Sequence, residues 1–343
     1  MKQHLNTLFV TTDGAYLAKA GDTVAVRVDN EVKLQVPLHH LGGIVCFGQV
    51  SCSPWLMAAC AESNVTISFL SASGRFLASV HGFTSGNVLL RREQYRQTDD
   101  VPATLGIVRN IVAAKIANTR TVLLRAGRDY PNADGHLALR SAAARLAQCA
   151  IQARDAGSAD MVRGIEGESA SLYFEVFNHL VTAQQDAFHI SGRNRRPPLD
   201  PINALLSFLY TVLAHDARSA CECAGLDAAV GFLHRDRPGR PSLALDLMEE
   251  FRAFLVDRLV LSLINRQQVR STGFRTSEAG GIEMDESTRK TVLTAYQERK
   301  QDTITHPFLG EQVTVGLLVH LQARLLARHL RGDLDAYPAF IWK

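Results

Sequence analysis

Residues Gly231 to Arg252 combine side chains that could bind a metal ion and act on a phosphate group. The stretch begins with an apolar run that ends at His234. The pair Pro241-Ser242 is predicted to open a helix, with Ser242 as its N-cap. The loop between them contains three arginines, Arg235, Arg237 and Arg240. Guanidinium groups form paired hydrogen bonds with phosphate oxygens, so this loop suits a phosphate-bearing substrate.

The predicted helix carries four acidic side chains along one face: Asp246, Glu249, Glu250 and Asp257. The preceding loop can fold His234 over the first turns of the helix, which would bring an imidazole together with one or two carboxylates. Nitrogen combined with hard oxygen ligands suits a catalytic divalent ion such as Mn²⁺ or Mg²⁺. An acidic stripe is more often a solvated face, and the local pattern alone favours that alternative.

Another acidic residue, Glu166, lies in a predicted helix that begins after Asp160 as its cap. The face that it shares is otherwise apolar, with Ala170, Tyr173 and Phe177 following at helical spacing. Burying an unpaired carboxylate costs on the order of several kcal/mol. We therefore expect Glu166 to have a metal ion, a proton or an arginine as its partner, and Arg163 is a candidate for the arginine.

The elements that must position these residues are of two kinds. Short strands separated by turn signals precede residue 90, together with one short helix capped by Ser53. The predicted strands are Thr7–Val10, Tyr16–Lys19, Thr23–Val28, Val32–Val36, Gly43–Cys46, Val65–Phe69 and Phe76–Val80. Helical spacing dominates afterwards. The sequence thus predicts an α+β fold, with a small β-rich scaffold or dimerisation domain at 1–90 and a larger all-α catalytic domain at 91–343.

Composition limits the class of protein. Hydrophobic residues make up 46% of the 343 residues and charged residues 21%, which is typical of a globular protein. The net charge of +3 is too small to indicate a nucleic-acid partner by itself. There is no apolar run long enough to span a bilayer and no signal peptide, so no membrane association is expected. The cysteines show no disulfide framework, which favours the cytoplasm.

Local pattern also predicts the character of three further segments. A basic, proline-rich loop runs from His189 to Asn203 and contains Arg193, Arg195 and Arg196, which could contact phosphates. Tyr210 in the helix that follows could belong to the core or contact a substrate. The aromatic tail that begins at Tyr337 is predicted to be flexible.

Three segments taken together resemble the Cas1 family, the CRISPR-associated spacer-acquisition integrase and endonuclease. They are R-G-I-E-G-E at Arg163–Glu168, G-F-L-H at Gly231–His234 and S-L-A-L-D-L-M-E-E-F-R at Ser242–Arg252. Supporting similarity comes from Leu89–Gln97, Arg109–Arg120 and Pro197–Tyr210. The order and spacing of these segments extend the resemblance over essentially the whole chain.

The resemblance implies that Glu166, His234 and Glu249 are the catalytic residues and bind Mg²⁺ or Mn²⁺. It implies that Asp246 either supports a ligand from behind or is an alternate ligand. Glu250 and Asp257 are then expected to be surface charges.

The resemblance also implies a reaction and a set of partners. The 3′-hydroxyl of a captured spacer precursor would attack double-stranded DNA at a CRISPR repeat, in the cytoplasm of a prokaryote. The basic loops and Tyr210 would contact the DNA. The enzyme would act as a homodimer, joined with the small protein Cas2 in a heterohexamer. Two alternatives stay open: a metal-dependent DNA repair nuclease, and a DNA-binding scaffold without catalysis.

Overall fold

A computed structural model describes residues 6–63, 65–71, 76–80, 82, 87–129, 135–194, 197–278 and 280–342. The chain divides into two compact units, each described here by itself. The first contains Met1–Gly86 together with Glu286–Gln301, and the second contains Asn87–Asp285 together with Asp302–Lys343. The helix Glu286–Gln301, which the sequence places within the C-terminal domain, therefore groups with the first unit.

The first unit contains two four-stranded sheets. One has the order β1 (Asn6–Val10), β5 (Leu41–Phe47), β7 (Thr66–Leu70) and β8 (Phe76–Val80), with the first three strands parallel. The other has the order β4 (Glu31–Pro37), β3 (Thr23–Val28), β2 (Tyr16–Ala20) and β6 (Ser51–Cys52). Every strand predicted from the sequence is present. Inward-facing aliphatic side chains of both sheets form one hydrophobic core, with Leu17, Val24 and Ile44 fully buried.

Two helices complete the first unit. Helix α1 (Pro54–Glu62) begins as predicted, because the Ser53 hydroxyl accepts a hydrogen bond from the backbone N–H of Leu56. Helix α9 (Glu286–Gln301) is held against β1 by the Lys300 ammonium, which donates to the Thr7 hydroxyl at 3.1 Å. The tertiary contact explains why sequence pattern alone could not assign this helix to its unit.

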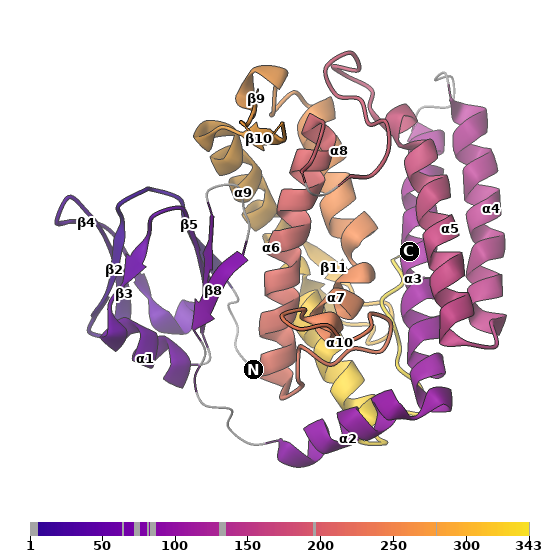
Figure 1. The fold of residues 1–343 in the computed structure, drawn as a ribbon, viewed down its shortest axis with the longest axis horizontal. Helices are drawn as coiled ribbons and strands as arrows, with labels where there is room; N and C mark the ends of the chain where they lie inside the picture. The colour runs from indigo at the N-terminus through magenta and orange to yellow at the C-terminus, as the bar shows by residue number, and fades with distance from the viewer. Residues whose placement is uncertain are drawn as a thin grey trace. The chain divides into compact units, whose positions relative to one another are not determined.

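The second unit is mostly helical (Figure 1). Helices α3 (Val101–Asp129), α4 (His136–Asp155) and α5 (Ala159–Glu175) pack side by side. Helix α6 (Pro201–Ala224) packs against both α7 (Ser242–Glu249) and α10 (Val315–Leu330). The second unit also contains α2 (Val88–Asp99), α8 (Arg258–Asn265) and 3₁₀ turns at Phe177–Leu180 and Ser271–Gly273. A further 3₁₀ turn, Leu38–His40, belongs to the first unit. The predicted architecture, a β-rich part followed by a mainly helical part, is confirmed.

Three details of the second unit differ from the sequence prediction. The unit is not entirely α-helical, because two short antiparallel ribbons are inserted, β9–β10 (Phe274–Thr276, Ile282–Met284) and β11–β12 (Thr303–Thr305, Gln312–Thr314). Ser158 rather than Asp160 caps α5, since its hydroxyl accepts from the Met161 N–H. Ser242 is the first residue of α7 rather than its N-cap.

The helix predicted to continue from Ser242 to Asn265 is interrupted. Helix α7 ends at Glu249, and a π-helical segment, Arg252–Asp257, separates it from α8. A π-helical turn contains an extra residue and shifts the faces of the helix beyond it. Side chains before and after the segment therefore do not keep the common face that a regular 3.6-residue repeat predicts.

Candidate active site

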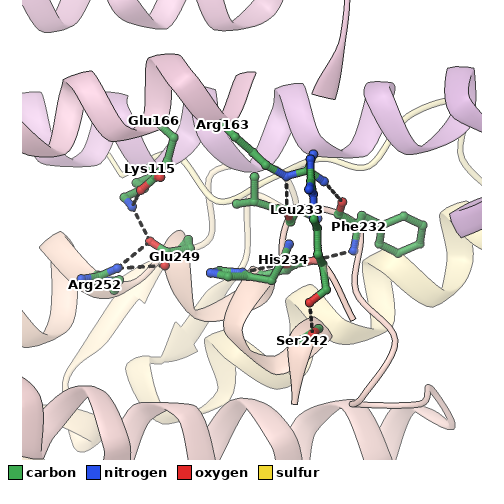
Figure 2. Close-up of polar contacts among 11 residues, drawn as sticks. Lys115, Arg163, Glu166, Phe232, Leu233, His234, Ser242, Glu249 and Arg252 are labelled. Carbon is green, nitrogen blue, oxygen red and sulfur yellow. Dashed lines mark hydrogen bonds and ion pairs between the residues drawn. The ribbon is translucent and has the colours of Figure 1, made fainter. Parts of the chain in front are cut away.

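A lysine that was not predicted to belong to the site connects two of the predicted catalytic residues. Lys115, from the middle of α3, forms ion pairs with Glu166 on α5 and with Glu249 at the end of α7 (Figure 2). Its Nζ lies 2.6 Å from Glu249 Oε2. The lysine side chain is only 10% exposed, so water does not compete strongly for these charges. Three elements that are far apart in sequence thus meet at one cation.

Glu249 is held on its other side by an arginine. Arg252 Nη1 donates to Oε1 at 2.8 Å and to Oε2 at 3.0 Å. Burial alone would raise the pKa of Glu249, but the charges of Arg252 and Lys115 outweigh burial and lower the pKa well below its ordinary value. Glu249 is therefore a carboxylate at any pH near neutrality.

Asp246 fixes the conformation around His234. Its Oδ2 accepts the backbone N–H groups of Phe232 (2.6 Å) and Leu233 (2.9 Å), and its Oδ1 accepts the backbone N–H (2.9 Å) and ring Nδ1 (2.7 Å) of His234. A carboxylate only accepts hydrogen bonds, so Nδ1 carries a proton, and in the neutral imidazole Nε2 then presents its lone pair. The ring extends toward Glu249 (Figure 2).

A glycine permits this arrangement. A Cβ on Gly231 would lie 2.8 Å from Asp246 Oδ2 and equally close to backbone and side-chain atoms of Ser242. Backbone atoms cannot move away cheaply at that distance, so only glycine allows the loop to approach the start of α7. The motif glycine at this position is therefore explained by packing.

We expect Asp246→Asn to reduce activity roughly 10–100-fold, the usual cost of losing a group that orients a ligand. Both carboxylate oxygens accept from N–H donors, and the amide nitrogen of asparagine would face two of those donors instead. Initial rates of DNA strand transfer would measure the effect. Asp236→Asn, an exposed change on the same loop, is the matched control. An unchanged rate in Asp246→Asn would show that the His234 orientation does not limit the reaction.

A cavity of about 640 Å³ opens beside the Lys115 ion pairs. Its walls come from α3, α5, the loop residues 190–193, α6 and the π-helical segment, and they include Lys115, Glu166, Tyr173, Arg193, Tyr210 and Arg252. One part of the wall is cationic and aromatic, because the guanidinium groups of Arg252 and Arg193 lie 4.1 and 5.4 Å from the centre of the Tyr210 ring. Glu166, Glu175 and Asp257 line other parts of the cavity. The cationic and aromatic part suits the phosphates and bases of a nucleic acid.

Asp257, expected at the surface, is buried in the wall of this cavity and accepts a hydrogen bond from the Tyr210 hydroxyl at 2.5 Å. Burial raises its pKa from the ordinary 3.8 to about 6, although the Tyr210 hydrogen bond and the Arg252 charge partly oppose the change. The sequence prediction was wrong here because the π-helical segment turns Asp257 away from the α7 face and toward α6.

The raised pKa of Asp257 predicts a pH dependence of stability. The folded protein holds the Asp257 proton more tightly than the unfolded chain. The stabilisation that this proton gives to the folded state is therefore present below about pH 4 and is lost as the pH rises through about 6. Asparagine does not titrate, so the stability of Asp257→Asn does not contain this pH-dependent loss. Between these pH values, we expect the unfolding free energy of the wild type to fall by about 3 kcal/mol relative to the variant. Urea unfolding across this range measures the difference, and parallel curves would contradict the expectation.

Glu250 is also buried, contrary to expectation, and it anchors the C-terminal tail. It accepts hydrogen bonds from the Tyr337 hydroxyl (2.5 Å), the Phe340 backbone N–H (2.6 Å) and the Gln322 side chain (2.9 Å). Burial raises its pKa to about 7 even though these donors oppose the shift. Because Glu249 and Glu250 are adjacent, one faces the Lys115 ion pair while the other faces the tail.

The tail itself was predicted to be flexible, and this prediction was wrong because the tail is docked on the second unit. Asn118, one turn after Lys115 on α3, donates to the Phe340 carbonyl and accepts from the Trp342 N–H. The Trp342 ring packs with Arg125 and Arg258, whose guanidinium carbons lie 3.9 and 4.4 Å from its centre. Hydrogen bonds and cation–π contacts together account for an ordered segment that has no regular secondary structure.

The arginines proposed for DNA contact lie in different surroundings. Arg195 and Arg196 fall outside the described residues. Arg235 and Arg237 are exposed, and Arg235 pairs with Asp160 at 2.8 Å, while Arg240 is half-buried. Arg193 is held by the side chains of Asn203 and Ser207 and lines the cavity.

Arg163 is not the partner of Glu166. It donates instead to the Leu233 carbonyl at 2.7 Å and to Asp160 at 2.6 Å, and so supports the backbone that leads to His234. Among the residues that the structure describes, no three His, Cys, Asp or Glu side chains already surround a point where a metal ion could sit. Lys115 lies between the two carboxylates, and Arg252 pairs with Glu249 on its other side. The sequence signal for Lys115 was a single charge within the otherwise uncharged run of residues 110–119.

Comparison with known proteins shows the family. The family described as "CRISPR associated protein Cas1" matches residues 8–298. Two curated relatives, both named CRISPR-associated endonuclease Cas1, come from Chlorobaculum tepidum and Rhodospirillum rubrum; each is 54% identical, with all of both chains covered. The chain belongs to the Cas1 family, and the enzyme class predicted from the sequence, a nuclease, is confirmed.

Solved structures share the fold. A casposase bound to integration product has a TM-score of 0.84 at 23% identity, covering 99% of this chain and 95% of its own. A CAS1 protein from Thermotoga maritima has a TM-score of 0.82 at 22% identity, covering 98% and 99%. In the described part of the chain, no helix has the length and apolar character needed to cross a membrane.

Proposed function

We propose that this protein inserts new spacer DNA into a CRISPR repeat array, and that Glu166, His234 and Glu249 hold a divalent cation, Mg²⁺ or Mn²⁺, for that reaction. One observation carries the proposal. Two carboxylates from different helices converge on a single cation, Lys115, beside a histidine whose Nδ1 is fixed by Asp246. A site that already binds one cation with two carboxylates has the donor chemistry for another.

The donors fit such an ion. Glu249 is ionised, and Glu166 is 28% exposed at the cavity, where an ion can reach it. In the neutral imidazole, the Nδ1–H bond to Asp246 leaves the His234 Nε2 lone pair for a metal ion. Asp246 is not suited as a direct ligand, since both of its oxygens already accept two hydrogen bonds each. When bound, the ion would polarise the phosphodiester and favour the attacking oxygen.

The reaction is a strand transfer that conserves phosphodiester bonds. The 3′-hydroxyl oxygen of the spacer bonds to phosphorus, and the bond from that phosphorus to the 3′ oxygen of the repeat strand breaks. The attacking hydroxyl loses its proton, and the leaving oxygen gains one. With water as the nucleophile, the same site cleaves DNA. Arg193 and Arg252 face the cavity and would bind phosphates, and the exposed Arg235 and Arg237 would extend that surface.

The titles of structural neighbours support a proposal about partners. A structural neighbour is titled a Cas6-RT-Cas1–Cas2 complex, and another is a casposase bound to integration product. These support DNA and a Cas2 protein as partners. A homodimer within a heterohexamer is also proposed. Exposed apolar residues on the sheet that contains β4, Val32 (51%) and Leu34 (46%), are compatible with a protein contact in the first unit.

A strand-transfer assay tests the function. It contains the protein, a Cas2 partner, a short duplex and a repeat-bearing plasmid, with Mn²⁺, Mg²⁺ or EDTA. We expect joining that requires metal and that disappears in His234→Ala while DNA binding persists. Cleavage without joining would favour the repair-nuclease alternative. DNA binding without any metal-dependent chemistry would favour the scaffold.

A further inference from the structure

The Lys115 ammonium is buried between the two carboxylates proposed to bind the divalent cation. Together with Arg252, it brings the formal charge of these four groups to zero, since two cations face two anions. A divalent ion added to this arrangement would meet two positive side chains in a partly desolvated site, where like charges repel strongly. One of the resident cations must therefore give way.

Arg252 is the less movable of the two. Its guanidinium donates to both oxygens of Glu249 and packs over the Tyr210 ring at 4.1 Å. Lys115 has a point charge on a flexible four-carbon chain, and its contacts are made by that charge alone. Lys115 also lines the cavity, so its side chain has space to move away from the carboxylates without entering the core.

We propose that Lys115 is a built-in counter-ion: it occupies the cation position of the metal-free enzyme, keeps Glu166 and Glu249 in place, and moves into the cavity when a divalent cation binds. There its ammonium faces the phosphates of the DNA. This inference rests on the proposed function, because it requires Glu166 and Glu249 to be metal ligands. It assigns two roles to one side chain, as the charge partner of the carboxylates before the ion binds and as a contact with the substrate afterwards.

Binding of Mn²⁺ alone to the full chain tests the inference, with free Mn²⁺ measured by electron paramagnetic resonance. In Lys115→Met, the competing charge is removed and chain length is retained, so we expect Mn²⁺ to bind at least tenfold more tightly than in wild type. In EDTA the same variant should unfold at a lower temperature, and Mn²⁺ should raise its unfolding temperature by more than that of wild type. Lys115→Arg keeps the charge in a less easily displaced group and should bind Mn²⁺ more weakly.

The outcomes separate the two hypotheses. Equal Mn²⁺ affinity in wild type, Lys115→Met and Lys115→Arg would overturn the counter-ion role. If Lys115→Met does not fold, the Lys115→Arg variant decides. An Mn²⁺ affinity of Lys115→Arg equal to or above that of wild type would then overturn the counter-ion role. Glu166→Gln is the control for the metal site itself. If it binds Mn²⁺ as well as wild type does, the proposed ligands are wrong and the inference falls with them; if it loses binding, only the Lys115 result decides.

Discussion

Replacing Glu249 with glutamine is expected to abolish strand transfer and also to lower the free energy of unfolding by about 3–5 kcal/mol. The carboxylate lies between two cations, Lys115 at 2.6 Å and Arg252 at 2.8 Å, and its side chain is 6% exposed. Glutamine has nearly the same shape but leaves Arg252 without its carboxylate and Lys115 with Glu166 alone, in a site that water hardly reaches. Urea unfolding and the joining assay, performed on the same preparation, measure the two effects.

Two variants show whether charge is the cause. Glu249→Asp keeps the anion and should retain most of the stability that glutamine loses. His234→Gln should remove activity with a much smaller loss of stability, because the His234 side chain is 22% exposed and its contact is one hydrogen bond. A stable Glu249→Gln protein would mean that the two cations find other partners, and the account of a compensated charge cluster would be wrong.

Replacing Phe340 with alanine is the second large effect that we expect, a loss of about 3–5 kcal/mol in unfolding free energy. The ring is fully buried and packs against Phe251 and Phe254, with ring centres 5.1 and 5.3 Å away. Truncation would leave a cavity between the tail and the segment that follows Glu249. Denaturant unfolding monitored by circular dichroism measures the change.

The neighbouring residue provides a matched control. Ile341 is 43% exposed, so Ile341→Ala should change stability by no more than about 0.5 kcal/mol. Equal effects of the two substitutions would show that the tail does not form part of the core. Strand transfer should fall in Phe340→Ala to the extent that α7 loses its support, and added Mn²⁺ should recover part of it if the cation stabilises the folded site.

Local chemistry was enough to predict much of the fold. The β-branched runs before residue 81 became strands because alternation and turn residues agree there, and Ser53 caps a helix as its side chain predicts. The position of Glu166 on an otherwise apolar helix face correctly indicated that it needs a partner. The partner was a lysine from α3 rather than Arg163, because helix packing brings residues together at separations that no local pattern encodes.

The environments of the four acidic residues on the predicted helix face could not be predicted from the sequence. A regular helix would place Asp246, Glu249, Glu250 and Asp257 on one face, and each instead has a different environment. Asp246 supports His234, Glu249 meets Lys115, Glu250 holds the tail and Asp257 meets Tyr210. The break after Glu249 and the π-helical segment cause the divergence, and neither has a signature in the residues themselves.

The docked tail has a consequence for how the enzyme is made. Glu166 and His234 leave the ribosome well before α10 and residues 337–342, which complete the packing around Glu250 and Asn118. A nascent chain therefore holds the chemical groups of a nuclease before it holds the support that aligns them. We expect DNA-cleaving competence to arise late, after synthesis of these last elements, so that unfinished chains pose little threat to the genome of the cell that produces them.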